Sequence, residues 1–420
     1  MPAGRNIKYH RIRKSLTQEE LATGIISISY LSKIENEQIT ASPEIIESLY
    51  KRLGIEEGIT NDSALSQELQ EWYQTILDKK TEKADELFTE LEYKLQQPSS
   101  FDNITLFDLI SIRYYLTKGL VTEAENKVKE LSSVQKDFNK ELLFYYYKFH
   151  GNLFYTKHMY SEAYEIYKSA ESLLDSSFSS YERADIFYSL GLSAGHLYKP
   201  YLAILYTNQA LEIFQKLYLR ERSAECHLLL GISFKKVKEY DEAETHYKWA
   251  GKLAEEEQSK VINGIIQHNL GQLSYVKKQF SQALKHFRNS LQLKEETNVS
   301  GKLMTLIAIM NMCYEFERGD LLEEYLYEAE KYTDKLPANN IQIIHEYKVF
   351  HYLVKEDFDS FVFYCGKVAI PYFKKNGLFL LEAQYAEILA SYYKKNRKYK
   401  QSSYYYEYAQ TTLKNQIINI

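Results

Sequence analysis

The stretch GNLFYTKHMYSEAYEIYKSA, residues 151–170, decides the fold because its pattern recurs three more times along the chain. Glycines recur at intervals of 40 residues, a first small residue follows each glycine after twelve positions, and a second follows seven positions later. An aromatic residue or a threonine lies between the two small residues. The repeated positions are Gly151, Gly191, Gly231 and Gly271; Ala163, Ala203, Ala243 and Ala283; Tyr167, Thr207, Tyr247 and Phe287; and Ala170, Ala210, Ala250 and Ser290. Small residues let the two helices of a hairpin cross closely while the larger residue fills the space beside them, which is the tetratricopeptide pattern.

The same frame extends in both directions from this central region. The related positions are Ala84 with Phe88, Ala124 with Val128, Leu322 with Ala329, and Ser402 with Tyr406 and Ala409. A degenerate unit is expected near residues 361–367. We therefore predict an all-α protein in which about nine tetratricopeptide-like hairpins, from about Leu65 to the end of the chain, form a right-handed superhelix. Only 6 prolines and 16 glycines in 420 residues agree with long helices and short connections.

The first sixty residues follow a different pattern, that of short helices separated by turns. Residues 5–14, RNIKYHRIRK, carry five positive charges and predict a short amphipathic helix with a basic face. Thr17, followed three residues later by Glu20, forms a capping box that starts a second helix. Gly24 predicts a tight turn, and a third helix is expected over residues 27–35.

A fourth helix is expected over residues 44–53, because Ser42 and Pro43 provide an N-cap and a proline at the first helical position. These signals divide the chain into a domain of residues 1–62 and a repeat domain of residues 63–420. The alternative interpretation of the first domain is a small helical bundle that binds no DNA.

The run TQEELA…SYLSKIE resembles the helix-turn-helix of the Xre/Cro-repressor type. In such domains the second of the paired helices enters the major groove by its N-terminal end. The resemblance predicts DNA contacts at the start of the third helix and a phosphate contact at the start of the second. The residues are Ser27, Ile28, Ser29, Tyr30 and Lys33 on the third helix and Gln18 on the second. Glu35 is expected to pair with Arg11 or Arg13 inside the domain.

The helix-turn-helix domain is nearly neutral, so we expect weak binding to a single DNA half-site. Two copies on a two-fold operator would strengthen it, which favours a homodimer. The whole chain has a net charge of −5, so any DNA contact must come from a local basic patch.

The first helix of each hairpin in this repeat type lines a concave groove that binds extended or helical peptides. With each glycine as position eight, the repeat frame directs a set of residues into that groove. These residues are Arg113, Lys148, Asn152, Tyr155, Tyr188, Ser189, His196, Lys235, His268, Asn269, Gln272, Tyr275, Asn311 and Tyr314. The peptide-binding candidates among them are Arg113, Asn152, Tyr155, His268, Asn269, Gln272, Tyr275 and Asn311. An asparagine amide can pair with both groups of a peptide backbone, and an arginine can pair with a carboxylate. Each residue singly could be a solvated polar side chain, but the set favours a binding groove.

Other kinds of site lack support in the sequence. The three cysteines are far apart, and His268 and His286 have no accompanying carboxylates, so no metal is expected. Nucleotide-binding and hydrolase motifs are missing, so we expect neither a cofactor nor an enzyme. The 39 tyrosines are interpreted as filler between helices rather than stacking platforms. Without an apolar leader or an 18-residue apolar run, a cytoplasmic protein that does not enter membranes is expected.

A Cro-type helix-turn-helix followed by about nine tetratricopeptide hairpins resembles the RRNPP family of Gram-positive quorum-sensing receptors. The resemblance covers the whole chain, and the string ATGIISISYLSKIEN, residues 22–36, is most similar to the neutral-protease regulator branch. It implies that a short secreted and re-imported signalling peptide binds the groove and shifts the oligomer, a dimer or a tetramer. DNA binding would thereby be turned on or off. It also implies that asparagines clamp the peptide backbone, with Asn269 in HNLG matching best and Arg113 supported by the repeat frame alone.

Two alternatives stay open beside this function. The protein could resemble Rap proteins, sequestering a response regulator of the sporulation phosphorelay or promoting its dephosphorylation, with residues 65–135 as the corresponding stretch. It could also be a repeat scaffold without a small ligand. One departure from related helix-turn-helix domains is Glu37, which stands where many of them have glycine.

Overall fold

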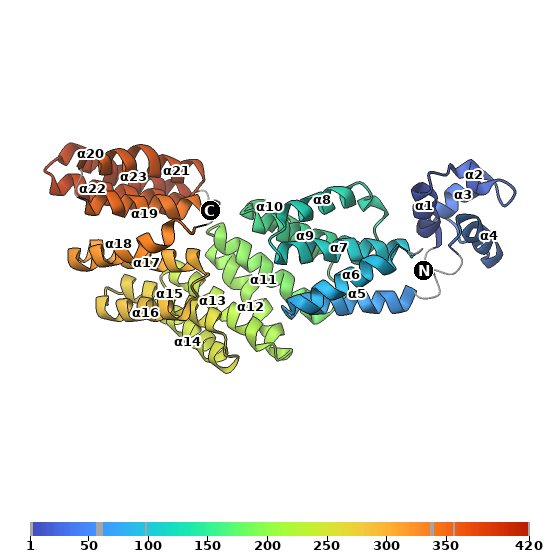
Figure 1. Cartoon of the computed structure of the whole chain (residues 1–420), viewed down its shortest axis with the longest axis horizontal. Coiled ribbons are helices and arrows are strands. Elements are labelled where there is room, and N and C mark those ends of the chain that lie inside the picture. Colours follow the sequence, from blue (N-terminus) through green and yellow to red (C-terminus); the bar gives the residue numbers. More distant parts are fainter. Residues whose placement is uncertain (1–2, 56–61, 97–98, 337–339, 356–357, 419–420) are drawn as a thin grey trace. The chain divides into compact units, whose positions relative to one another are not determined.

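Short helices and tight turns form the N-terminal domain in the computed structural model, which describes residues 3–55, 62–96, 99–336, 340–355 and 358–418. The helices are α1 (Ala3–Arg13), α2 (Gln18–Ala22), α3 (Ile28–Glu35) and α4 (Pro43–Leu53). Figure 1 shows them in dark blue at the N-terminal end. This is the predicted helix-turn-helix arrangement, with α2 and α3 as the paired helices.

The predicted turn signals are present as hydrogen bonds and backbone angles. The Thr17 hydroxyl accepts from the Glu20 amide at 3.1 Å, and the Glu20 carboxylate accepts from the Thr17 amide at 2.7 Å. This completes the capping box that begins α2. Gly24 has a φ of 74°, the left-handed conformation that a glycine adopts without strain. The prediction of cap, turn and second helix is therefore confirmed.

Glu35 is buried inside the domain and is fully partnered there. The Arg11 guanidinium donates to both of its carboxylate oxygens, at 2.6 and 2.8 Å. The Gln18 side-chain amide donates a third hydrogen bond at 2.7 Å. The predicted pairing of Glu35 with a cation of the first helix is confirmed, with Arg11 as the partner.

Glu37 occupies the position where related domains have glycine, and its backbone explains that preference. Its φ is 55°, in the left-handed region that side chains other than glycine rarely adopt. The Glu37 carboxylate accepts from Arg5 Nε at 2.7 Å. The turn thus forms with glutamate, and an ion pair offsets part of the backbone strain.

The basic first helix is used inside the protein. The Asn6 side-chain oxygen accepts from the Phe101 amide at 2.6 Å, and His10 Nε2 lies 2.7 Å from the Ser99 carbonyl oxygen. Lys8 pairs with Asp137 at 2.7 Å. Because Phe101 begins α7, these contacts attach the helix-turn-helix domain to the first repeats.

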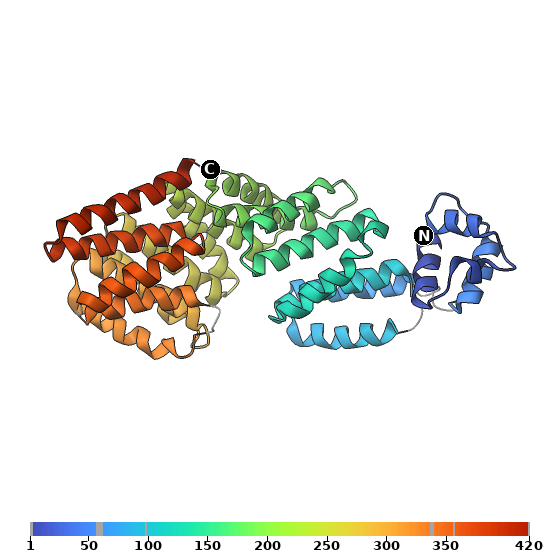
Figure 2. The ribbon, with the colours of Figure 1, turned by 90° about the horizontal axis from the view of Figure 1, so that it is seen from above.

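The remaining described helices follow one another as consecutive hairpins, which confirms the predicted all-α repeat (Figures 1 and 2). The first three hairpins are α5 (Asp62–Leu77) with α6 (Thr81–Lys94), α7 (Phe101–Thr117) with α8 (Val121–Ser132), and α9 (Lys140–Thr156) with α10 (Tyr160–Ser172); the short helix η1 (Gln135–Asp137) precedes α9, and α11 (Ser180–His196) and α12 (Pro200–Lys216) follow α10 in the chain. The next three are α13 (Arg220–Lys236) with α14 (Tyr240–Glu256), α15 (Lys260–Val276) with α16 (Phe280–Leu293), and α17 (Val299–Glu315) with α18 (Gly319–Thr333). The last two are α19 (Ile341–Val354) with the segment α20 (Phe358–Phe363), η2 (Tyr364–Ala369) and α21 (Ile370–Lys375), and α22 (Phe379–Lys395) with α23 (Tyr399–Ile418). The chain folds as two compact units, Met1–Ser193 and Ala194–Ile420, so the helix-turn-helix shares a unit with the first hairpins.

The recurring glycines lie where the two helices of a hairpin meet most closely. A Cβ atom at Gly151 would lie 2.5 Å from the Tyr167 ring, and one at Gly271 would lie 2.6 Å from the Phe287 ring. Such contacts are too short for any side chain larger than glycine. In the hairpins of Gly151, Gly231 and Gly271 the aromatic residue therefore packs on the backbone of its glycine, as the repeat predicted.

The degenerate unit expected near residues 361–367 is a helix interrupted by a π-helical turn. The segment Tyr364–Ala369 has π-helical hydrogen bonding between two α-helical pieces, and Pro371 is the second residue after it. Proline has no amide hydrogen and clashes with the carbonyl four residues earlier in an α-helix. The wider turn accommodates it and explains why the tetratricopeptide frame is weak there.

Glu346 on α19 is a buried acid without a cation beside it. It accepts hydrogen bonds from Tyr385 at 3.1 Å and from Gln342 at 3.1 Å. Burial raises its pKa to about 7, although these hydrogen bonds act in the opposite direction. The folded protein therefore holds this proton up to a higher pH than the unfolded chain does.

We predict that this group makes the protein less stable as the pH rises from about 4.5 to about 7. The free energy of unfolding lost over that window is about 3 kcal/mol at most. Glu346→Gln should remove this pH dependence and be the more stable form at pH 8, measured by urea unfolding. Glu323→Gln, at an exposed position of α18, is the matched control. An unchanged pH dependence in Glu346→Gln would contradict the assignment.

Candidate DNA-reading helix and ligand groove

The start of α3 presents side chains that the core does not use. Ser27, Ser29 and Lys33 are exposed, and Ile28 is 47% exposed although it is a large apolar residue. Tyr30 is half-buried against the domain core. An exposed isoleucine beside a small hydroxyl can contact a thymine methyl group and a base edge in the major groove. Ser27, Ile28 and Ser29 are therefore accessible together at the start of α3, whereas the exposed Lys33 lies in its last turn.

Two of the predicted DNA contacts, Ser27 before α3 and Gln18 on α2, also form hydrogen bonds inside the domain. The Ser27 hydroxyl caps α3 by accepting from the Tyr30 amide at 3.2 Å. Gln18, predicted to bond a phosphate, is half-buried and gives one amide hydrogen to Glu35. Only its remaining amide hydrogen is available for a phosphate, so this contact stays a prediction.

Three groove candidates lie in the first compact unit. Arg113 is half-buried on α7 and forms no ion pair with any residue that the structure describes. The Asn152 side-chain oxygen accepts from the Tyr167 hydroxyl at 2.7 Å, which leaves its amide hydrogens available. Tyr155 is half-buried and packs on the Tyr160 ring. Arg113 and Asn152 thus have hydrogen-bonding capacity that the fold does not use.

The second unit holds a continuous chain of polar side chains on the first helices of three successive hairpins. Lys235 on α13 donates to the Gln272 side-chain oxygen on α15. The Gln272 amide nitrogen lies 2.9 Å from His268 Nε2, and His268 Nδ1 lies 3.0 Å from the Thr305 hydroxyl on α17. Lys294, which follows α16, donates to the same hydroxyl. We call these five residues the polar chain.

The two lysines fix the direction of every hydrogen bond in the polar chain. Because the Gln272 oxygen accepts from Lys235, its amide must donate to His268 Nε2. His268 is then neutral and donates from Nδ1 to Thr305. Burial, reinforced by the charges of Lys294 and Lys235, lowers the pKa of His268 to about 3, which agrees with the neutral ring. The polar chain thus has a cation at each end and no anion.

The two other asparagine candidates differ in how many hydrogen bonds their side chains form within the protein. Asn269 on α15 is buried, and its amide donates to the Ile265 carbonyl at 3.0 Å while its side-chain oxygen has no protein donor. Asn311 on α17 donates to the Ile307 carbonyl at 3.0 Å and accepts from Gln384 at 2.6 Å. The predicted clamp role fits Asn269, whereas packing against α22 occupies the amide of Asn311.

Tyr275, the last predicted groove residue, is tied to charged neighbours at the end of α15. Its hydroxyl donates to Glu315, which also pairs with Lys278. The structure therefore groups His268, Gln272 and Asn269 on α15 and leaves Tyr275 in a separate ionic cluster.

Thr305 and Lys294 were missed by the sequence analysis. Thr305 is fully buried and lies outside the inward positions of the repeat frame. Lys294 is the C-cap of α16, where the backbone turns extended with a ψ of 129° and the repeat frame no longer applies. Its lack of an acidic partner three or four residues away was the only sequence signal, and that signal is weak.

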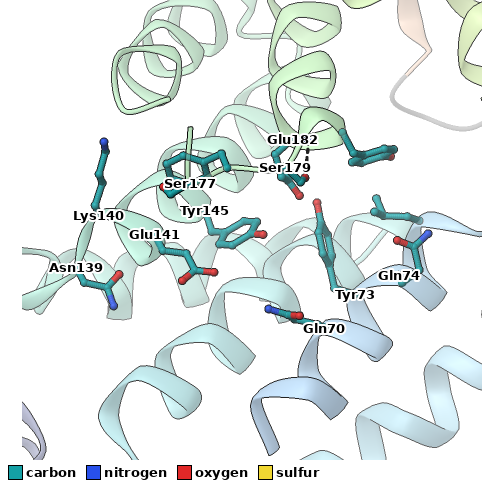
Figure 3. Close-up of a pocket in the computed structure, with 13 residues that line it drawn as sticks. Gln70, Tyr73, Gln74, Asn139, Lys140, Glu141, Tyr145, Ser177, Ser179 and Glu182 are labelled. Atoms are coloured by element: carbon teal, nitrogen blue, oxygen red, sulfur yellow. Dashed lines mark hydrogen bonds between the residues drawn. The ribbon is translucent and has the colours of Figure 1, made fainter. Parts of the chain in front are cut away.

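A separate pocket of about 540 Å³ lies between α5 and the starts of α9 and α11 (Figure 3). Tyr73 points from α5 towards Glu182 on α11, and Glu141 and Tyr145 line another wall. Lys148, predicted to face the groove, is 1% exposed and pairs with Glu182 and, at 2.8 Å, with Asp185. Its amine also donates to the Tyr73 hydroxyl at 2.9 Å. The structure therefore corrects the assignment of Lys148, which is a core ion rather than a groove residue.

The described part of the chain offers no group of three or more histidine, cysteine or acidic residues arranged for a metal. In the same residues no helix is both long and apolar enough to cross a membrane.

Comparison with known proteins matches both parts of the chain. A helix-turn-helix family model matches residues 7–59. Transcriptional activator NprA of Geobacillus stearothermophilus is 35% identical over 405 residues, covering 94% of this chain and 100% of the activator. The chain belongs to the family of this activator. The match confirms the RRNPP resemblance and supports a transcription regulator.

Solved structures of this family agree on the fold. A Rap protein complexed with competence and sporulation factor superposes with a TM-score of 0.74 at 18% identity, covering 85% of this chain and 100% of that one. NprR in complex with its cognate peptide NprX superposes with a TM-score of 0.64 at 21% identity, covering 84% of this chain and 98% of that one. At these identities the likeness shows the helical-repeat fold alone.

We predict that Lys148→Met destabilises the protein by about 3–5 kcal/mol, because it leaves Glu182 and Asp185 buried without a cation. Burial lowers the pKa of Lys148, but Asp185 and Glu182 raise it well above its usual range, so the lysine is charged at neutral pH. Thermal unfolding would measure the loss. Lys140→Met on the same helix is the control, since its pair with Asp175 is exposed and should cost below about 1 kcal/mol. Equal effects of the two changes would contradict the prediction.

Proposed function

We propose that the chain is a transcription regulator whose DNA binding and oligomeric state are switched by a short signalling peptide bound to the repeats. The observation that carries this proposal is the polar chain together with Asn269. Apart from Lys294 at the end of α16, these side chains come from the first helices of successive hairpins, and the two lysines, Gln272 and Asn269 keep hydrogen-bonding capacity that the fold leaves unused. A peptide backbone supplies the matching donors and acceptors.

A single helix connects Arg113, the predicted partner of a ligand carboxylate, with the helix-turn-helix domain. Arg113 lies near the C-terminal end of α7, and Phe101 at its N-terminal end holds the Asn6 side chain of α1. A helix is stiff and rises about 1.5 Å per residue, so a contact at Arg113 acts about 18 Å from that docking point. A shift or tilt of α7 on ligand binding would move the surface on which the helix-turn-helix rests.

The DNA contact at α3 can be tested with Ile28→Ser in the full chain. Loss of the apolar base contact should weaken binding to a specifically retained genomic fragment by about 1–3 kcal/mol. Ile12→Ser is the matched control, because Ile12 is also exposed, at 57%, but lies on α1. Binding is measured by fluorescence anisotropy at fixed salt concentration. If neither fragment selection nor anisotropy detects specific binding, with or without peptide, the regulator proposal fails.

The peptide contact can be tested with Asn269→Ala. Pools of random pentapeptides are added to the full chain while DNA retention and oligomer mass are followed, and a peptide is isolated from any active pool. Asn269→Ala should weaken binding of that peptide by about 1–3 kcal/mol in calorimetry, because a backbone amide pair is lost. Asn263→Ala, half-buried on the same helix, is the control. If every pool leaves DNA binding and oligomer mass unchanged, the switch does not exist.

A further inference from the structure

Lys235 and Lys294 of the second unit differ from Lys277 and Lys302 in the partners of their amines. Lys277 pairs with Glu244 at 2.8 Å, and Lys302 pairs with Glu296. Lys235 and Lys294 have no carboxylate within ion-pair distance among the described residues. Both are half-buried, so solvent does not fully replace the missing anion.

The partners that these lysines do have are all neutral. Lys235 donates to the Gln272 oxygen, and Lys294 donates to the Thr305 hydroxyl and, at 2.8 Å, to the Gly301 carbonyl. An ammonium group has three hydrogens, so each amine keeps at least one donor for another acceptor. The fold therefore holds two spare cationic donors at the two ends of the polar chain.

The remaining charged and titratable groups near the polar chain do not neutralise it. Lys236, next on α13, adds a positive charge and donates to the Gly195 carbonyl. His268 between the two ends is neutral. Close to Lys294 in sequence, Glu296 is taken by Lys302, and Glu295 is exposed in the loop after α16.

The energetic consequence is that the empty groove carries an unfavourable charge. Burial, together with Lys236, lowers the pKa of Lys235 to about 8, and burial lowers the pKa of Lys294 to about 8. Removing a cation from water without pairing it with an anion costs free energy. No interaction with an anion in the described structure offsets this cost at Lys235 or Lys294. An arriving carboxylate would remove this cost at each end.

We propose that Lys235 and Lys294 form an anion subsite that takes carboxylate groups of the bound peptide, and that the groove selects acidic peptides. The inference rests on the proposed peptide-binding function and adds the chemical class of the ligand. The two carboxylate sources are an Asp or Glu side chain and the free C-terminus, which share the same chemistry. A lysine ammonium group and a carboxylate form a strong ion pair when both are shielded from water.

The test uses two random pentapeptide libraries, one with free C-termini and one with amidated C-termini, incubated with the full chain. Bound peptides are recovered by size exclusion and sequenced by mass spectrometry. We expect enrichment of Asp or Glu in the amidated library, and enrichment of the free-ended library over the amidated one if the C-terminus supplies a carboxylate. The double variant Lys235→Gln/Lys294→Gln should lose this acidic preference while still retaining peptides, because Gln keeps a donor to Gln272 and Thr305.

Lys252→Gln is the matched control, since Lys252 is exposed on α14, and it should leave the preference unchanged. Circular dichroism and thermal unfolding establish that each variant is folded. Peptides enriched without acidic residues or terminal preference, or an acidic preference that survives in the double variant, would overturn the anion subsite and leave the proposed function standing. Enrichment of nothing at all would overturn the proposed function as well.

The number of protons taken up when a peptide binds gives a second test. A preference for acidic peptides caused by other residues would not produce this uptake. At pH 8 each lysine with a pKa of about 8 is about half-protonated, and pairing with a carboxylate completes its protonation. Calorimetry of the most enriched pentapeptide in two buffers of different ionisation enthalpy should show uptake of up to about one proton per peptide. The double variant should take up none. Proton release, or uptake unchanged in the double variant, would contradict the assignment.

Discussion

The close crossing of the two helices in each hairpin is the constraint on which the rest of the repeat domain depends. At Gly151 and Gly271 an aromatic ring of the second helix occupies the space that a Cβ atom would need. This packing fixes which face of the first helix turns towards its own hairpin. The opposite face does not pack within its own hairpin, so polar side chains there cost little stability.

This difference between the two faces of the first helix explains how the polar chain can form. Lys235, His268 and Thr305 come from three successive first helices, yet none of them replaces a residue of the glycine–aromatic contact. Their hydrogen bonds run between hairpins rather than within them. Such bonds each contribute about 1 kcal/mol, whereas a half-buried cation without an anion opposes them. The arrangement is therefore better suited to holding a ligand than to holding the fold.

Much of the fold could be predicted because it follows from local rules. The capping box at Thr17 and Glu20 and the 40-residue spacing of glycines concern neighbours in sequence or in a fixed repeat, and both predictions were confirmed. Glu35 could be predicted to pair with Arg11 or Arg13 because a carboxylate is unfavourable at a DNA-binding surface, and Arg11 is the partner.

The parts that could not be predicted depend on contacts between distant segments. Asn311 was expected to be open to a ligand, but Gln384 lies 73 positions later and binds its oxygen. Lys148 was placed in the groove by its repeat position, but the buried acids of α11 draw it into the core. The repeat frame gives the face of a helix, and it carries no information about which partner reaches that face.

The docking of the helix-turn-helix domain has the strength that a switch requires. The Lys8–Asp137 pair is partly exposed and contributes about 0–1 kcal/mol, and the Asn6 bond to the Phe101 amide adds about 1 kcal/mol. With the His10 contact to Ser99 the polar attachment amounts to a few kcal/mol. Coupling free energies between a ligand and a distant site are typically about 1–3 kcal/mol, which is the same size. Under the proposed function, a peptide that favours one placement of α7 would shift the helix-turn-helix domain against this polar attachment and against the contact between the Tyr9 and Phe101 rings, whose centroids are 5.4 Å apart.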